Sequence, residues 1–209
     1  LIEQLAGGLT PVRARSIARE AVILTLIVAL ELALLAVTGE FRPDLSASLL
    51  LPQSWWRFGG LGLLAVMAGW CALASYAPDG KARLGRQLTV LTAIALVAVG
   101  WVIDASETAA AGSIAERLMW RNGIDCVVTM LILAVAPLIT LGILMRRGAA
   151  ADLAASATAS SFAGAGFAAL VFSFNCPHDD PLYVVVWYAI GIALITFAGR
   201  LILPRLTRW

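Results

Sequence analysis

The chain has 209 residues, of which 61% are hydrophobic and 13% charged, and its formal net charge at neutral pH is +2. A soluble domain is about half apolar and about a quarter charged. This composition therefore excludes an ordinary cytosolic enzyme, a protein that binds nucleic acid directly and a disordered tail. Three cysteines are too few for a secreted disulfide scaffold. The mean hydropathy of +0.90 indicates an integral membrane protein instead.

Six apolar segments are long enough to cross a bilayer as helices. A helix rises about 1.5 Å per residue and a hydrocarbon core is about 30 Å thick, so one span requires roughly 20 apolar residues. The segments cover residues 21–39, 59–77, 87–103, 124–145, 153–174 and 181–203, and the third is the shortest. We therefore expect an all-α fold, with a six-helix transmembrane domain over residues 21–209.

The basic residues predict the orientation of these spans. Cytoplasmic loops carry an excess of Lys and Arg, and eleven of the fifteen fall on the side that holds both termini. These eleven are Arg13, Arg15, Arg19, Lys81, Arg83, Arg86, Arg146, Arg147, Arg200, Arg205 and Arg208. The other side holds Arg42, Arg57, Arg117 and Arg121. We therefore expect a multi-pass protein with both termini in the cytoplasm.

Residues 1–20 form the largest predicted cytoplasmic segment. Leu1, Leu5 and Leu9 repeat every four residues, with Ile2 on the same flank, until Pro11 breaks the pattern. Twenty residues cannot bury a core of their own. The segment is either a frayed tail on the membrane surface or a peptide that folds into the groove of a partner. Because the chain begins with Leu rather than Met, we expect further residues to precede it.

The connection between the fifth and sixth spans concentrates side chains that can ionise or bind a metal ion. Cys176, His178, Asp179 and Asp180 fall within five residues, between two prolines that stiffen the turn. The two acids are suited to capping the sixth helix, because its first N–H groups are unpaired. The alternative is that these acids and His178 are ligands of a metal ion.

Cys126 is a candidate partner for Cys176, because the span count places both at the outer membrane face. Two such thiols can form a disulfide or hold a thiophilic metal ion, with Asp125 or His178 as auxiliary ligands. Two cysteines fifty residues apart are also compatible with two unrelated small residues. Cys71, within the second span, is expected to be a packing residue.

Glu31 is the single acid midway along the first span. An intramembrane acid is a functional candidate, because burying its charge is costly. It either relays protons or is protonated and hydrogen-bonded to the Ser- and Thr-rich fifth span. The small residues of that span predict a helix in the centre of the bundle.

A family resemblance follows from these motifs. The segment 175–183, Asn-Cys-Pro-His-Asp-Asp-Pro-Leu-Tyr, followed by Trp187 and an Arg-rich end, resembles the signature of the NrsF-like proteins, the negative regulators of sigma F. Residues 1–6 and 10–13 resemble the opening of that family, and six spans match its length. The chain departs from the family where a His often precedes this Cys and an acid follows two positions later. Asn175 and His178 stand there instead.

The resemblance implies a polytopic anti-sigma factor of a bacterial inner membrane, not an enzyme. Such a protein sequesters an extracytoplasmic-function sigma factor at the cytoplasmic face of the membrane. It also implies that a periplasm-facing cysteine pair, here Cys126 and Cys176, senses heavy metals or oxidants. Apart from transient binding of a thiophilic metal ion by that pair, no cofactor is expected.

The N-terminal segment is then the predicted sigma-binding element. The residues expected to make this contact are Leu1, Ile2, Leu5, Leu9, Pro11 and Val12. The alternative function is a small membrane transporter for a metal ion or a proton-coupled solute, which would use Glu31 and the Cys/His turn. The sequence disfavours this alternative, because the spans hold one mid-membrane acid and no paired broken helices.

Overall fold

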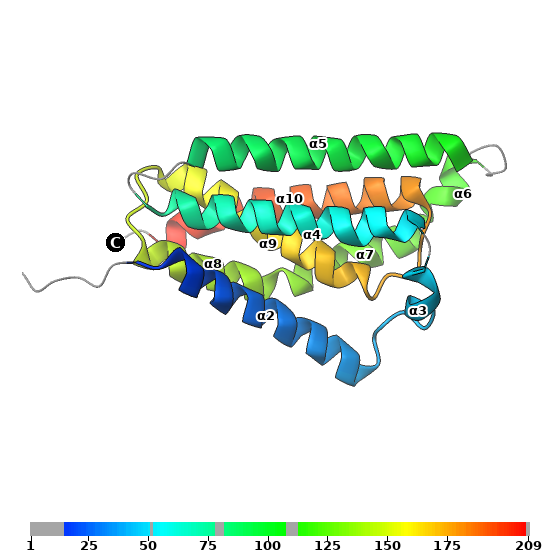
Figure 1. The fold of residues 1–209 in the computed structure, drawn as a ribbon, viewed down its shortest axis with the longest axis horizontal. Helices are drawn as coiled ribbons and strands as arrows, with labels where there is room; N and C mark the ends of the chain where they lie inside the picture. Colours follow the sequence, from blue (N-terminus) through cyan, green and yellow to red (C-terminus); the bar gives the residue numbers. More distant parts are fainter. Residues whose placement is uncertain (1–14, 51, 78–81, 108–112, 208–209) are drawn as a thin grey trace, which may run out of the picture.

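The computed structural model describes residues 15–50, 52–77, 82–107 and 113–207, and these ranges contain helices and no strand. The expected all-α fold is therefore confirmed for them. The helices in chain order are α2 (Ile17–Thr38), α3 (Leu45–Ser48), α4 (Pro52–Ser75), α5 (Ala82–Glu107), α6 (Ile114–Leu118), α7 (Trp120–Leu133), α8 (Val135–Arg147), α9 (Leu153–Ser173) and α10 (Pro181–Thr207) (Figure 1).

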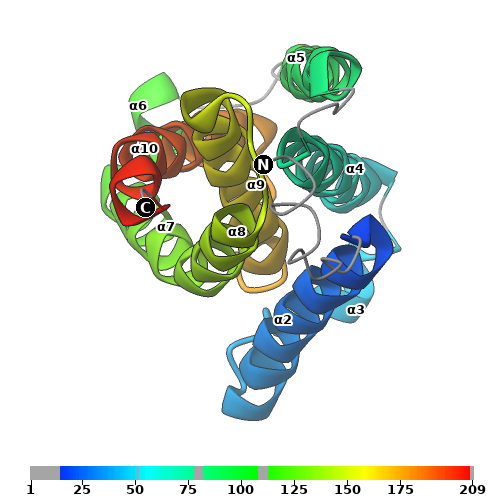
Figure 2. The same ribbon diagram turned by 90° about the vertical axis from the view of Figure 1, so that its left-hand side faces the viewer.

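Six helical stretches of the described chain are long and apolar enough to cross a membrane, which agrees with the predicted number of spans. The start of α2 and the end of α10 lie at the same end of the bundle (Figures 1 and 2). We call this the terminal end. The opposite end, which holds α3, α6 and the α9–α10 connection, is called the loop end.

Two predicted spans differ from the observed helices. The third, expected to be the shortest, is the 26-residue α5, which extends through several polar residues at both ends. The fourth, expected to be one helix, is divided into α7 and α8 at Ala134. Pro137 explains the division, because its ring has no N–H to donate to the carbonyl of Leu133 and collides with that carbonyl in a regular helix.

Helix α9 occupies the centre of the bundle, as its small residues predicted, and α4, α7, α8 and α10 surround it (Figure 2). Two thirds of its most apolar 18-residue stretch is buried. Its small side chains permit close approach: a Cβ on Gly164 would lie 2.7 Å from the side chain of Leu138. On α10, a Cβ on Gly199 would lie 2.3 Å from Ser161 Oγ. Close backbone packing at small residues is typical of membrane helix bundles.

Helices α2 and α5 lie at the periphery. Within the most apolar 18 residues of each helix, 11% of α2 and 17% of α5 is buried. The side chain of Ser16 caps the start of α2 by accepting from Arg19 N, and Gly39 ends it in the left-handed conformation (φ 74°) that favours glycine. Helix α2 is therefore a well-capped rod that packs lightly on the bundle and runs between the terminal end and the loop end.

Candidate functional site

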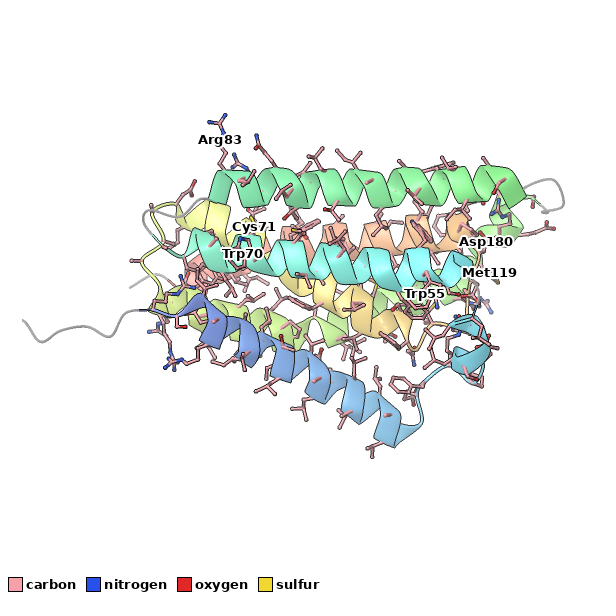
Figure 3. The ribbon with its side chains drawn as sticks, in the orientation of Figure 1. Trp55, Trp70, Cys71, Arg83, Met119 and Asp180 are labelled. Atoms are coloured by element: carbon pink, nitrogen blue, oxygen red, sulfur yellow. The ribbon has the colours of Figure 1, made fainter. Side chains whose placement is uncertain are left out.

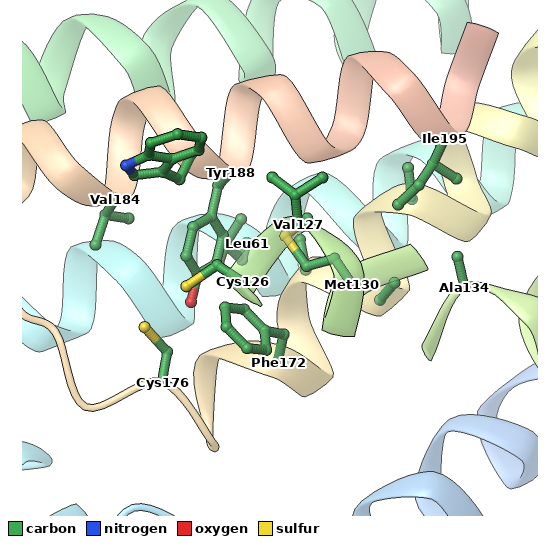
Figure 4. Close-up of a cluster of buried hydrophobic side chains, with 14 of the residues drawn as sticks. Leu61, Cys126, Val127, Met130, Ala134, Phe172, Cys176, Val184, Tyr188 and Ile195 are labelled. Atoms are coloured by element: carbon green, nitrogen blue, oxygen red, sulfur yellow. The ribbon is translucent and has the colours of Figure 1, made fainter. Parts of the chain in front are cut away.

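The two predicted sensor thiols lie together at the loop end. Cys126 is on α7 and Cys176 is in the α9–α10 connection, and their side chains hydrogen-bond each other. Figure 4 shows the two sulfur atoms facing one another beside Phe172. Both are free thiols and both are buried, with exposed fractions of 6% and 0%. The span count alone had placed them at one face, and the structure brings them into contact.

Two tyrosines of α10 complete the surroundings of the thiols. The hydroxyl of Tyr183 lies 3.0 Å from Cys126 Sγ, within hydrogen-bonding distance. The hydroxyl of Tyr188 is directed towards the thiol pair (Figure 4). Both tyrosines are buried. The thiols are therefore enclosed by protein, and any metal ion or oxidant that reaches them requires the α9–α10 connection to open.

We define residues 174–180 as the thiol loop. Its first residues are held by the end of α9, because Asn175 N and Cys176 N both donate to Phe172 O, at 2.9 and 3.0 Å. The segment that follows α2 docks on the same loop, because Arg42 N donates to Phe174 O at 3.1 Å. The thiol loop is thus attached by its backbone to two elements that are far apart in the sequence.

Asp179 of the thiol loop forms ion pairs with two buried arginines. Arg42 donates to both of its carboxylate oxygens at 2.7 and 2.6 Å, and to both oxygens of Asp44 at 2.8 and 2.7 Å. Arg57 of α4 lies 3.0 Å from Asp179 and donates to the carbonyls of His178 and Ser173 at 2.7 and 3.2 Å. Bidentate Arg–carboxylate pairs are among the strongest hydrogen bonds in proteins.

Asp180 is held from the other side by Arg117 of α6. Arg117 donates to both of its oxygens at 2.8 Å and also pairs with Asp104 near the end of α5. Asp180 Oδ1 additionally accepts from Leu182 N and Tyr183 N at 2.9 and 3.2 Å, so it caps α10. The expected capping role is therefore confirmed for Asp180, whereas Asp179 pairs with arginines.

We call these seven charged residues the Arg–Asp clamp. Its members are Arg42, Asp44, Arg57, Asp104, Arg117, Asp179 and Asp180. The clamp joins the α2–α3 connection, α4, α5 and α6 to the thiol loop. Apart from the two acids of the thiol loop, sequence reasoning missed its role. The sequence held a signal for it, because three of the four basic residues on the side predicted to lie opposite the termini belong to it.

The imidazole of His178 lies near the thiols, and the backbone of the same residue hydrogen-bonds Cys176. Its Nε2 is 3.1 Å from Asn122 Nδ2, and its ring meets that of Tyr183 edge to face with centroids 4.6 Å apart. Burial, together with the charges of Arg42 and Arg57, lowers the pKa of His178 although Asp179 opposes this shift. The imidazole is therefore neutral at neutral pH, the form that binds metal ions.

The surroundings also favour the thiolate form of Cys176. The hydrogen bond from Cys126 lowers the pKa of Cys176 to about 7 although burial opposes the shift, and the backbone of His178 and the charge of Arg57 add to the lowering. The thiolate is the form that attacks oxidants and binds metal ions. Asp44 and Asp180 are charged partners of the clamp: Arg42 lowers the pKa of Asp44, and Arg117 lowers that of Asp180 against the effect of burial.

The predicted ligands do not form a preassembled metal site. Among the described residues, no group of three or more His, Cys, Asp and Glu side chains has a geometry able to hold a metal ion. Cys126 and Cys176 offer two sulfur ligands, and His178 is near them. Asp125 is exposed, and Asp179 and Asp180 are engaged by arginines. A metal ion held by more than the two sulfurs therefore requires rearrangement of the thiol loop.

The other candidate residues lie away from this site. Cys71 is buried near the terminal end, far from Asp180 at the loop end (Figure 3). Glu31 Oε2 is buried and has no hydrogen-bond partner in the described part of the chain. The predicted sigma-binding residues precede Arg15, outside the described residues; they are Leu1, Ile2, Leu5, Leu9, Pro11 and Val12.

The fold and site define a multi-pass helical membrane protein whose loop end encloses two thiols beneath an Arg–Asp clamp. A family model described as "NrsF: Negative regulator of sigma F" matches residues 5–209. The chain therefore belongs to the family of negative regulators of sigma F, a regulatory rather than a catalytic family. It is 28% identical over 183 residues to the anti-sigma-F factor NrsF of Caulobacter vibrioides (strain NA1000 / CB15N), covering 85% of this chain and 83% of that protein. No solved structure matches this chain.

Proposed function

We propose that this protein is an inner-membrane anti-sigma factor that binds an extracytoplasmic-function sigma factor on the cytoplasmic side and releases it when Cys126 and Cys176 react with a heavy metal or an oxidant. Family membership supports the anti-sigma role. The observation that carries the sensing role is the direct contact of two free thiols on separate elements, beneath the clamp.

The signal chemistry acts on the thiol pair. A divalent thiophilic ion replaces the two thiol protons and bridges the sulfurs. A peroxide removes two electrons and two protons from the pair, which forms a disulfide and releases water. Either product breaks the hydrogen bond between Tyr183 and Cys126 and shifts Cys176, and the thiol loop moves with it. To convert a mostly bound sigma factor into a mostly free one, the signal must favour the released state by roughly 5 kcal/mol, a size that metal–thiolate binding or a disulfide supplies.

Helix α2 provides the route from the sensor to the sigma factor. Its loop-end side is followed at once by Arg42, which bonds Asp179 of the thiol loop. Its other end, which begins at Ile17, lies within residues 1–20, the proposed sigma-binding segment. Because α2 is a capped rod with little burial, a displacement of Arg42 moves the whole helix at low cost. The basic residues of the terminal end support its placement in the cytoplasm.

The anti-sigma role is tested by co-purification. The full-length protein is expressed in its membrane, solubilised in mild detergent and recovered with its bound proteins, alongside a version that lacks residues 1–20. We expect a sigma factor with the intact protein and its loss on truncation. Equal recovery from both versions would place the binding site elsewhere, and no sigma factor in either would refute the role.

The sensing role is tested with a transcription reporter for the sigma factor. Cys126→Ser and Cys176→Ser should each abolish the increase in transcription that cadmium or peroxide causes, whereas the matched variant Cys71→Ser at the terminal end should respond like the parent. If both outer variants still respond fully, the thiol pair is not the sensor, although the anti-sigma role survives.

A further inference from the structure

Two adjoining grooves run between the peripheral helix α5 and the bundle formed by α4, α9 and α10. Their volumes are about 430 and 630 Å³. Both grooves are lined by Thr158, Phe162 and Arg200, so they join into one continuous groove. We call it the α5 groove. It adjoins the thiol site at Tyr188 of α10, which lines the groove and directs its hydroxyl towards the thiols.

The loop-end part of the α5 groove is apolar and lies at the depth of the membrane spans. Its lining includes Leu61 of α4, Val97 of α5 and Ala193 of α10. Along α10 it extends from Val184 to Arg200, sixteen residues or about 24 Å of helix. One leaflet of a bilayer is about 15 Å of hydrocarbon, so this part is long enough for a whole acyl chain.

The terminal-end part of the α5 groove is basic. Arg83, Arg86 and Arg200 line it together with a single acid, Asp152. The Asp152 carboxylate already accepts from Ala155 N at 3.0 Å and caps α9. Arg83 extends outwards from α5 at the rim (Figure 3). Within the described part of the chain no acidic side chain pairs with Arg86 or Arg200, and both are exposed. A positive charge therefore stands unneutralised where the groove reaches the membrane surface.

We propose that the α5 groove binds an anionic glycerophospholipid, with its phosphate between Arg86 and Arg200 and an acyl chain along α5 and α10. The chemistry of the two parts matches that of the two halves of such a lipid, and basic pockets between membrane helices are a known way to bind anionic head groups.

Lipid binding has a mechanical consequence for α5. At the loop end, α5 is fastened by the pair of Asp104 with Arg117 and by the contact of Gly100 with Trp56 and Val185. At the terminal end, the groove separates α5 from α9 and α10. A bound lipid fills that space and connects Arg86 of α5 to Arg200 of α10 through its phosphate.

Native mass spectrometry of the full chain in mild detergent tests the proposal, with palmitoyl-oleoyl phosphatidylglycerol and phosphatidylcholine as probes. We expect one phosphatidylglycerol to bind in preference to phosphatidylcholine. One arginine at an anionic lipid surface contributes an about five-fold preference, so Arg86→Gln with Arg200→Gln should reduce this preference roughly 25-fold. Arg205→Gln removes the same charge from the exposed end of α10 outside the groove and should leave the preference unchanged.

A second pair of variants tests the acyl-chain path. Ala193→Trp fills the apolar lining and should reduce lipid binding at least ten-fold, whereas Ala95→Trp, on the exposed outer face of α5, should not. Equal binding of the two lipids, an equal loss in Arg205→Gln, or unchanged binding in Ala193→Trp would each overturn the proposal. Displacement of the lipid by millimolar inorganic phosphate would also overturn it, because it would show a site for the anion alone.

Discussion

The two ends of the bundle differ in the burial and pairing of their arginines. At the loop end, Arg42, Arg57 and Arg117 all pair with carboxylates, and the side chains of the first two are at most 2% exposed. At the terminal end, the one recorded ion pair of the described residues joins Arg15 to Glu20. Arg86 and Arg200, by contrast, are exposed and have no acidic partner among the described residues.

This difference separates two kinds of task. Buried, mutually satisfied charges fix the relative positions of the elements that carry them, and they resist change until one partner is displaced. Exposed basic residues without partners are free to meet an anionic lipid or an acidic protein surface. The loop end is therefore suited to holding the thiol loop in one position, and the terminal end to binding.

The largest effect is expected from breaking the clamp. Asp179→Ala leaves the buried guanidinium of Arg57 without its carboxylate and Arg42 with half of its hydrogen bonds, so we expect a loss of about 3 kcal/mol in the free energy of unfolding. The measurement is denaturant unfolding in detergent, followed by tryptophan fluorescence. Asp125→Ala is the matched control, an exposed acid near the same end, and should change stability by less than about 0.5 kcal/mol. Equal effects of the two variants would show that the clamp does not hold the loop end.

A smaller effect is expected from crowding the loop end. A Cβ on Gly123 would lie 1.9 Å from the ring of Trp187, whose indole N–H donates to Leu118 O at 2.8 Å. Gly123→Ala should therefore destabilise the protein by about 2 kcal/mol in the same unfolding measurement. Gly142→Ala on α8, towards the terminal end, meets no atom within 4 Å and should be neutral or slightly stabilising. Similar losses from both would show that the approach of Gly123 to Trp187 does not cause the destabilisation.

The smallest effect concerns the reactivity of Cys176. Because its pKa is lowered to about 7, its thiolate fraction rises with pH below 7 and levels off above it. The rate of alkylation by iodoacetamide, followed by peptide mass spectrometry between pH 5.5 and 9, should show this plateau. Cys126→Ala removes the hydrogen bond that lowers the pKa most, so the plateau should move to higher pH and the rate at pH 7 should fall by less than about ten-fold. A parent rate that keeps rising ten-fold per unit above pH 8 would contradict the lowered pKa.

The sequence by itself determined the helical class, the number of spans and the central place of α9. These properties follow from apolar length, from the need to satisfy backbone hydrogen bonds in lipid and from side-chain size, all of which are local. The same reasoning put Cys126 and Cys176 at one face and offered Asp179 and Asp180 as caps of α10, of which Asp180 is one. The break between α7 and α8 was also local, since Pro137 stands in the sequence, but the apolar length of the segment concealed it.

Only the tertiary structure decided which charges meet. Arg42 and Asp179 are 137 residues apart, and no periodicity relates them. The enclosure of the thiols by Tyr183 and Tyr188 and the groove beside α5 depend on the rotation of each helix about its axis. That rotation is set by packing against several neighbours at once, because hydropathy assigns a helix to the membrane without choosing the face that it turns to each partner.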